Sequence, residues 1–170
     1  MIKRIRISGI GGQGIVFSGW LLGYAATLEG LYSSVHNQYG SEVRGGTVIS
    51  SIVVSDKPIE NPYVDVFDMY LILHDFGWRS IVNYRGSEII IADREIAYSS
   101  KALNYNVDWY YISYEAFKNK LPINMIALGV LAKYNVISLD SLKEAIKSRG
   151  RRVEENIKAV EIGFRLSKVV

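Results

Sequence analysis

The chain is 170 residues long, the size of one domain, and its 49% hydrophobic and 22% charged residues indicate a globular protein and not a disordered one. Its 20 Lys and Arg against 17 Asp and Glu give a net charge of +3, and because the basic residues are scattered among acidic ones, nucleic acid is not an expected partner. The absence of cysteine excludes disulfides, cysteine-bound zinc and an iron–sulfur cluster held by this chain, and it fits a cytoplasmic location.

The first half of the chain is predicted to contain three strands and one helix. Charged and β-branched residues alternate over residues 3–8, which predicts a first strand, and a glycine loop follows it. Residues 14–28 predict a helix in which Gly19, Gly23, Ala25 and Ala26 form a flat face for close packing on a sheet. Residues 31–36 predict a short second strand, residues 37–46 a polar loop, and the sequence TVISSIVVS at 47–55 a third strand.

Residues 7–28 carry no charge and follow three basic residues, a pattern that resembles a signal peptide or a membrane span. The glycines and Gln13 would break a spanning helix in its first third, so neither export nor a membrane partner is expected.

The second half is predicted to complete the sheet and then to become helical. Apolar runs at residues 68–74 and 87–92 predict buried strands joined by a short helix near residues 76–84, and residues 109–112 predict the last strand. Helical spacing covers residues 124–134, 138–148 and 153–167, with Ser138 as a candidate N-cap. Because the third strand follows the second with no crossover helix, the sheet is expected to be mixed. The sequence therefore predicts one α/β domain over residues 1–170, a three-layer Rossmann-like fold with a mixed, mostly parallel sheet and C-terminal helices.

The glycine loop, Gly9-Ile10-Gly11-Gly12-Gln13-Gly14, fits the spacing G-x-G-x-x-G. A strand, a glycine turn and a helix N-terminus together present free backbone N–H groups and the positive end of a helix dipole, so an anion such as phosphate can bind there. A dinucleotide site also needs an acidic residue at the end of the second strand, where this chain has Val35-His36-Asn37-Gln38 instead. A free-standing Rossmann-type nucleotide-binding domain is one alternative interpretation, and a tight turn with no ligand is another.

A second unusual stretch, residues 38–47, contains Glu42, Arg44, Gly45 and Gly46. An Arg before two glycines and just ahead of a strand is a cation beside backbone that a ligand can approach closely. Arg can grip a phosphate or a carboxylate through two parallel hydrogen bonds. The alternative interpretation is a β-turn that carries a solvated Arg.

Several motifs follow one another along essentially the whole chain. They are the glycine loop, Gln38-Tyr39-Gly40 with Glu42-Val43-Arg44-Gly45-Gly46, Ser55-Asp56 with Pro58-Ile59, Asp68, Asn124-Met125-Ile126-Ala127-Leu128-Gly129, and Glu154-Glu155-Asn156 with Ala159 and Gly163. In this order they resemble the gamma subunit of 2-oxoacid:ferredoxin oxidoreductases, which is an internal domain in fused members of the family.

The resemblance implies that the chain is one subunit of an enzyme that oxidatively decarboxylates a 2-oxoacid to an acyl-coenzyme A and passes two electrons to ferredoxin. Such enzymes need thiamine diphosphate, Mg2+ and iron–sulfur clusters. This chain has neither the GDG…N pattern of thiamine sites nor a cysteine, so these cofactors are expected on partners, namely alpha and beta subunits that bind thiamine and a delta subunit with the clusters. The motif Ser55-Asp56-Lys57-Pro58-Ile59 and the short chain favour the 2-oxoglutarate type over the pyruvate, branched-chain and indolepyruvate types.

The resemblance also places this domain near the coenzyme A end of the active site and implies no catalytic residue and no metal site. The residues expected to contact the cofactor are Gly11, Gly12, Gln13, Gly14, Glu42, Arg44, Gly45 and Gly46. In this hypothesis the amides of the glycine loop and the Arg44 side chain seat coenzyme A. Gln13 hydrogen-bonds the ligand or a partner chain, and Glu42 orients Arg44.

Other candidate residues have structural interpretations that compete with a functional one. The two histidines are expected to be structural, with His74-Asp75, at the end of a strand, the better ligand candidate. Asp65 and Asp68 suggest a metal pair, but their positions at a loop and a strand start explain them equally well. Arg149-Gly150-Arg151-Arg152 predicts a solvated corner, with a phosphate or subunit contact as the alternative. Five aromatic residues are expected to lie in the core or an interface, namely Phe17, Trp20, Trp109, Tyr110 and Tyr111. An exposed apolar patch is also expected, because the domain should dock on larger subunits.

Overall fold

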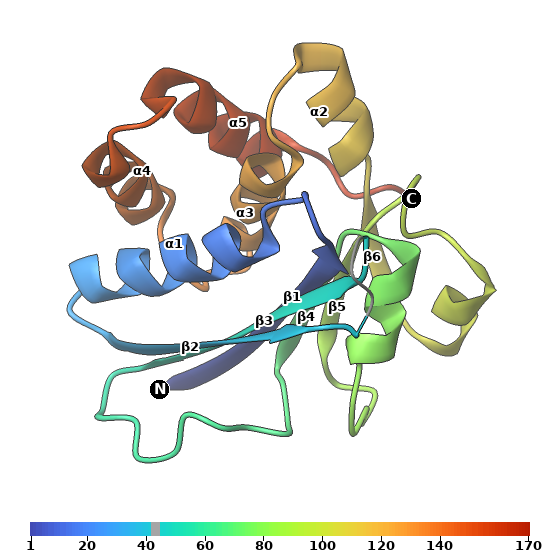
Figure 1. The fold of residues 1–170 in the computed structure, drawn as a ribbon, viewed down its shortest axis with the longest axis horizontal. Helices are drawn as coiled ribbons and strands as arrows, with labels where there is room; N and C mark the ends of the chain where they lie inside the picture. The colour runs from blue at the N-terminus through green and yellow to red at the C-terminus, as the bar shows by residue number, and fades with distance from the viewer. Residues whose placement is uncertain (42–44) are drawn as a thin grey trace.

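The structure is a computed structural model that describes residues 1–41 and 45–170. A six-stranded sheet with the order β2-β3-β1-β4-β5-β6 forms its centre (Figure 1). The strands are β1 (Ile2–Ile10), β2 (Tyr32–Tyr39), β3 (Thr47–Ser55), β4 (Met69–Ile72), β5 (Ile89–Asp93) and β6 (Val107–Tyr110). β3 pairs antiparallel with β1 and β2, whereas β1, β4, β5 and β6 run parallel. The predicted fold class, an α/β domain with a mixed sheet, is confirmed.

The α-helices gather over one face of the sheet, and short 3-10 helices cover the other. The helices are α1 (Ile15–Leu28), α2 (Ile112–Asn119), α3 (Ile123–Ala132), α4 (Leu139–Arg149) and α5 (Val153–Arg165). Helices α1, α3, α4 and α5 lie above the sheet in Figure 1. The opposite face packs against η1 (Asp75–Ser80) and η2 (Ser100–Asn104) through Phe67, Tyr70, Ile72, Trp78, Ile90, Ala92, Ala97 and Ala102.

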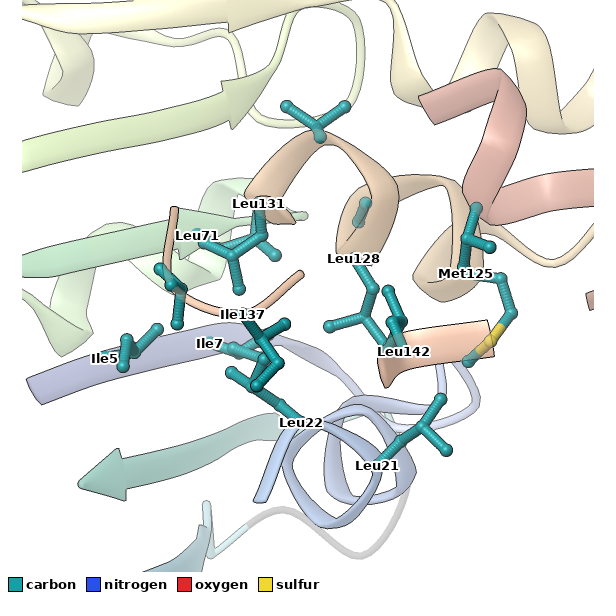
Figure 2. Close-up of a cluster of buried hydrophobic side chains, with 14 of the residues drawn as sticks. Ile5, Ile7, Leu21, Leu22, Leu71, Met125, Leu128, Leu131, Ile137 and Leu142 are labelled. Atoms are coloured by element: carbon teal, nitrogen blue, oxygen red, sulfur yellow. The ribbon is translucent and has the colours of Figure 1, made fainter. Parts of the chain in front are cut away.

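Strand β1 is central and buried on both faces, and its two faces differ in chemistry. Ile5 and Ile7 face the α-helices and join the larger core, where they meet leucines from α1, α3 and α4 (Figure 2). Arg6 and Ser8 alternate with them and reach the other side, where Arg6 donates to the Ser80 carbonyl at 2.9 Å. The alternation of side chains in a strand therefore places an apolar layer under the helices and a polar layer over η1.

Helix α1 lies close to the sheet because two of its residues have no side chain. A Cβ on Gly19 would stand 1.9 Å from Ser50 Oγ, and one on Gly23 would stand 2.8 Å from Val35 Cγ2. The flat helix face predicted from the sequence is thus confirmed, and it holds the first turn of α1 over the ends of β1 and β3.

Helices α3 and α5 cross with their backbones in contact. A Cβ on Gly129 would stand 2.1 Å from the Val160 carbonyl oxygen, and one on Gly163 would stand 1.9 Å from the Ile126 carbonyl oxygen. The crossing fixes α5, and with it the connection between α4 and α5.

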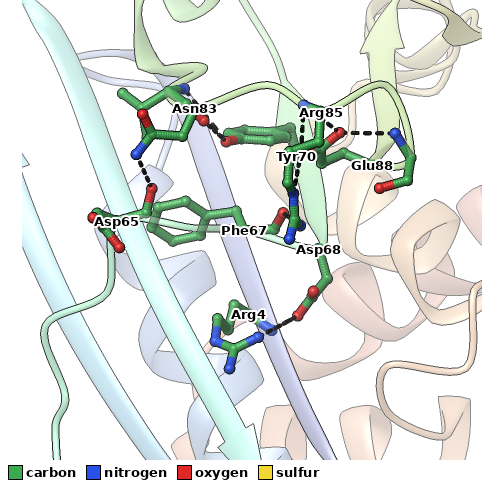
Figure 3. A network of polar contacts seen from close by, with 10 residues as sticks. Arg4, Asp65, Phe67, Asp68, Tyr70, Asn83, Arg85 and Glu88 are labelled. Carbon is green, nitrogen blue, oxygen red and sulfur yellow. Dashed lines mark hydrogen bonds and ion pairs between the residues drawn. The ribbon is translucent and has the colours of Figure 1, made fainter.

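A polar network fastens the loop before β4 and the turn before β5 to the sheet (Figure 3). Asp68 accepts the Arg4 backbone N–H at 2.8 Å, and its carboxylate lies 3.5 Å from the Arg4 guanidinium. Burial of the Glu88 carboxyl opposes its ionisation, but hydrogen bonds from the Arg85 side chain and from nearby backbone N–H groups outweigh burial and lower the pKa of Glu88. Asp68 therefore has a structural role, whereas the sequence had also suggested a metal pair with Asp65.

Several elements differ from the sequence prediction, three of them by more than a residue or two at their ends. β2 continues to Tyr39, so residues 37–39 are strand and not loop. The segment near residues 76–84 forms the 3-10 helix η1. β6 ends at Tyr110 and α2 begins at Ile112, whereas the sequence predicted a strand over 109–112 and no helix there.

The uncharged run at residues 7–28 divides into β1, the glycine loop and α1, and no helix in the described residues is long and apolar enough to cross a bilayer.

Candidate functional site: a groove at the glycine loop

The glycine loop connects the end of β1 to the first turn of α1. Gly12 and Gly14 have φ values of 89° and 74°, in the left-handed region that glycine adopts without steric cost. Gly14 is the N-cap of α1 and provides no side-chain cap, so the first turn of the helix keeps its N–H groups available. The sequence thus places an uncapped helix N-terminus directly after the loop.

The loop amides divide into occupied and open groups. The Gly11 N–H donates to the Gly46 carbonyl at 3.2 Å, and the Gln13 N–H donates to the Ile10 carbonyl at 3.2 Å. Within residues 1–41 and 45–170, no acceptor bonds the N–H groups of Gly12 and Gly14 or those of the first turn, Ile15, Val16 and Phe17. The hypothesis that the amides of residues 11–14 hold an anion therefore narrows to Gly12, Gly14 and the first turn of α1.

The Gln13 side chain bridges the carboxyl ends of β1 and β4. Its Oε1 accepts the Ile10 N–H at 2.9 Å, and its Nε2 donates to the Leu73 carbonyl at 2.9 Å. Both ends of the amide are bonded within the chain, so Gln13 shapes the loop. The bridge lies at the carboxyl ends of two neighbouring parallel strands, the edge at which open α/β sheets place their ligands.

The two glycine-bearing motifs meet through one backbone hydrogen bond. The Gly11–Gly46 hydrogen bond joins the glycine loop to the residues that precede β3, and Gly40 donates to the Thr47 carbonyl at 2.7 Å across the base of the connecting loop. Gly45 is exposed and Gly46 is buried. Glu42 and Arg44, which the sequence assigned to the cofactor site, lie outside the described residues.

A groove of about 620 Å³ opens beside the loop. It is lined by Ile10, Gly11, Gly12, Gly14, Ile15, Val16, Phe17, Trp20, Tyr39, Val48 and Arg149. A second cavity of about 290 Å³ shares Phe17 and Arg149 with it and is lined further by Pro122, Asn124, Met125, Arg151, Arg152 and Asn156. The charged residues in the described lining are arginines, Arg149 in both cavities and Arg151 and Arg152 in the second, and they favour a negatively charged ligand.

The basic corner at residues 149–152 lies beside the groove, since Arg149 lines both cavities and Arg151 and Arg152 line the second. Its arginines are exposed, as expected for the predicted solvated corner, and the alternative of a phosphate or subunit contact stays a prediction. No local pattern in the sequence indicates that the end of α4 packs beside α1, more than 120 residues earlier in the chain. Asn124 forms part of the same wall and donates to the Gly14 carbonyl at 3.3 Å. Phe17 and Trp20 line the groove; Phe17 is partly buried and also packs against the larger core, whereas Trp20 is exposed.

The other candidate residues lie elsewhere and have structural partners. His74 Nδ1 accepts the Phe76 N–H at 3.2 Å and caps η1, while Asp75 pairs with Lys101 at 2.6 Å. His36 contacts the edge of the Tyr63 ring, with the ring centroids 5.1 Å apart. No group of three or more His, Asp or Glu side chains in the described part of the chain is arranged to hold a metal ion.

The aromatic residues near β6 divide between core and surface. Tyr110 is buried, and Trp109 packs against Trp78 on the 3-10 face. Tyr111 is 44% exposed, and α2 adds Tyr114 and Phe117, which are 49% and 88% exposed. The described surface therefore includes an exposed apolar patch around α2.

The fold and the groove define a Rossmann-like α/β domain in which a glycine loop leads into an uncapped helix N-terminus. The family model of pyruvate ferredoxin/flavodoxin oxidoreductase matches residues 4–166, and the chain belongs to this family. The resemblance stated from the sequence motifs is thereby confirmed.

Individual relatives agree with this assignment. The 2-oxoglutarate synthase subunit KorC of Archaeoglobus fulgidus is 34% identical over 168 residues, which cover 98% of this chain and 89% of that protein. The crystal structure of the gamma subunit of a keto/oxoacid ferredoxin oxidoreductase from Geobacter sulfurreducens PCA matches with a TM-score of 0.80 and 28% identity, over 96% of this chain and 95% of that one.

A longer protein contains the same fold. The 2-oxoglutarate:ferredoxin oxidoreductase from Magnetococcus marinus, solved with 2-oxoglutarate, coenzyme A and succinyl-CoA bound, matches with a TM-score of 0.83 and 22% identity. The match covers 96% of this chain and 30% of that chain, so the fold here corresponds to one part of a larger enzyme.

Proposed function

We propose that the chain is the gamma-type subunit of a 2-oxoglutarate:ferredoxin oxidoreductase and that its glycine loop helps to seat coenzyme A in the assembled enzyme. In the overall reaction the 2-oxoacid loses its carboxylate as CO2, two electrons pass to ferredoxin, and the acyl group is transferred to the coenzyme A thiol. The choice of 2-oxoglutarate is supported by the 34% identical relative, which is a 2-oxoglutarate synthase subunit.

The proposed division of labour follows from what the sequence contains. A chain with no cysteine holds no cysteine-ligated iron–sulfur cluster, so the path for electrons belongs to a partner. Alpha and beta subunits would supply thiamine diphosphate and Mg2+, and a delta subunit would supply the clusters. In this proposal the chain is inactive alone and is cytoplasmic.

The observation that carries the coenzyme A assignment is the uncapped N-terminus of α1 at the edge of a groove that Arg149 also lines. The open N–H groups of Gly12, Gly14 and the first turn are donors of the kind that hold a diphosphate. The Magnetococcus marinus enzyme, which contains this fold, was solved with coenzyme A bound. Glu42, Arg44, Gly45 and Gly46 remain predicted contacts, with Arg44 the proposed second anchor for the anion.

The test uses Gly11→Ala in the enzyme purified with its partners. A Cβ at residue 11 meets no atom within 4 Å, so the variant folds normally while a methyl group projects from the loop where it lines the groove. We expect the KM for coenzyme A to rise severalfold, while 2-oxoglutarate decarboxylation without coenzyme A stays normal. Arg44→Ala is expected to act in the same direction. Unchanged coenzyme A dependence in both variants would remove the loop from the site.

A free-standing nucleotide-binding domain is the alternative function. It predicts tight binding of NAD, NADP or FAD by the chain alone, measured by calorimetry, whereas the proposed function predicts no tight binding.

A further inference from the structure

The outward side of helix α2 carries aromatic residues where a solvent-facing helix ordinarily carries polar ones. Tyr111, Tyr114 and Phe117 follow one another at three-residue intervals, and all three are exposed, Phe117 by 88%. Ile112 and Ala116 are buried and form the inward side, so α2 is apolar on both sides. Such a helix is expected where a second protein surface covers its outer side.

Helices α4 and α5 show the ordinary arrangement. The exposed residues of α4 include Glu144 and Lys147, which form an ion pair, and those of α5 include Glu154 and Lys158. Because these helices present charges to solvent, the aromatic outward side of α2 is a local feature that the rest of the helical layer does not explain.

The start of α2 is held in place by a buried carboxylate at the end of β5. Asp93 is fully buried, and it accepts the Ser113 N–H at 2.6 Å and the Ser113 hydroxyl at 2.8 Å. It also accepts the N–H groups of Glu95 and Ile96, at 3.1 and 2.7 Å. The aromatic side chains therefore stand on a fixed backbone, so a partner that covers them has little conformational entropy to remove.

Helix α2 lies at the same edge of the sheet as the glycine loop. Strands β1, β4, β5 and β6 run parallel, and at their carboxyl ends the loop follows β1 and α2 follows β6 (Figure 1). Pro122 and Asn124, which come shortly after the end of α2, line the second cavity beside the loop. A protein surface that covers the outward side of α2 is therefore next to the groove.

The border of the aromatic side is basic. Lys118 and Lys120 are exposed, and the Lys118 ammonium lies 5.8 Å from the Tyr114 ring centroid. Within the described part of the chain, no carboxylate lies within 4.0 Å of either lysine. The carboxylate of Glu115 is engaged inside the helix, where it accepts the Asn119 amide at 3.0 Å. A partner with an apolar hollow and carboxylates beside it would complement this side.

We propose that Tyr111, Tyr114 and Phe117 form the surface by which this chain docks on the thiamine-binding subunits, with carboxylates of those subunits facing the two lysines. This inference rests on the proposed function and adds to it the place of contact. The 2-oxoacid loses its carboxylate at the thiamine-binding subunits, and the resulting acyl group must reach the coenzyme A thiol. Those subunits, and not the one with the clusters, therefore face the edge that carries the groove and α2.

The test is co-purification of the assembled enzyme. A tagged copy of the full chain is expressed with its partner subunits, and the subunits that it retains are identified and quantified by mass spectrometry. Phe117→Asp places a charge on the aromatic side, and because Phe117 is 88% exposed, the chain alone folds as before. We expect the amount of retained thiamine-binding subunits to fall about tenfold or more. Tyr114→Asp should act in the same direction.

A matched control and a charge variant sharpen the test. Leu103→Asp changes an apolar residue that is 79% exposed on η2, away from α2, and should retain the full amount of every subunit. Lys118→Glu combined with Lys120→Glu should lower retention less than Phe117→Asp does, and the loss should shrink at high salt concentration, because it results from charge.

The outcomes separate this inference from the proposed function. If the unaltered chain, Phe117→Asp and Tyr114→Asp retain the thiamine-binding subunits equally, the α2 assignment is wrong and the proposed function stands. If Phe117→Asp releases only the iron–sulfur subunit, or only separates two copies of this chain, the surface has another occupant and the inference is wrong. If the unaltered chain retains no partner, the proposed function fails together with the inference.

Discussion

Glycine has opposite uses in two regions of this protein. At the crossing of α3 and α5, the space that a Cβ would occupy at Gly129 or Gly163 is filled by the backbone of the other helix. At the glycine loop, a Cβ on Gly11 or Gly12 would meet no atom within 4 Å. The missing side chains thus bring two helices together in the first region and leave an open groove in the second. A motif of glycines therefore indicates close approach, but only the surrounding structure shows whether the neighbour is the protein itself or another molecule.

Gly163→Ala should produce the largest loss of stability. The new Cβ would lie 1.9 Å from the Ile126 carbonyl oxygen, and because this oxygen belongs to a helix backbone, α3 and α5 must separate. We expect the free energy of unfolding to fall by about 3 kcal/mol. Urea denaturation of the purified chain measures the change, with Lys158→Ala, an exposed site on the same helix, as the matched control. Equal midpoints for the two variants would contradict the close crossing.

Gly14→Ala should cause an intermediate loss of stability. Gly14 has a positive φ, like Gly12 in the loop, and a close neighbour, like the glycines at the helix crossing. Its φ of 74° strains any other residue, and a Cβ would lie 2.4 Å from Asn124 Nδ2. We expect a loss of about 2 kcal/mol. Combining it with Asn124→Ala should cost less than the sum of the two single changes, since the contact is relieved. Strict additivity in denaturation experiments would show that the two residues do not touch.

Gly12→Ala should be milder, because only the backbone conformation opposes it. Its φ is 89° and the space around it is open, so we expect a loss of about 1 kcal/mol. Gly12→Asn should be better tolerated, since Asn adopts left-handed conformations more readily than Ala. A loss as large as that of Gly163→Ala would mean that the loop is packed and not open.

Gly11→Ala should leave stability unchanged within about 0.5 kcal/mol. It has neither a positive φ nor a close neighbour, and its N–H can still donate to Gly46. Thermal unfolding of the two proteins is the measurement. A marked destabilisation would remove the basis for using this variant as a kinetic probe of the groove.

The sheet and the first helix were predictable because their signals are local. The alternation in β1, the β-branched run of β3 and the small residues of α1 each specify an element without reference to the rest of the chain. Helix α2 was missed because the run from Trp109 to Ile112 is uniformly apolar and aromatic, and no side chain caps the helix where it starts. The change from strand to helix at Tyr111 therefore leaves no periodic signal.

The site was predictable only in part. The glycine spacing located the loop, and its pairing with Gly46 agrees with the combined motif. The hydrogen bonds of the Gln13 side chain with Ile10 and Leu73 depend on the position of β4 beside β1. That position is set by the tertiary structure and cannot be read from the local sequence. Similarly, the position of Arg149 beside Trp20 results from the packing of α4 on α1, and the sequence around Arg149 predicts only a polar turn.

The two cavities draw their lining from parts of the chain that are far apart in sequence, namely residues 10–20, Tyr39, Val48, residues 122–125 and residues 149–156. The smallest unit that keeps both cavities is therefore nearly the full domain, even though the recognisable motif occupies a few residues near the start. A shortened version that keeps β1, the loop and α1 would keep the motif and lose the opposite wall. Divergence among related proteins at the α4–α5 corner could thus alter ligand preference while the glycine motif stays the same.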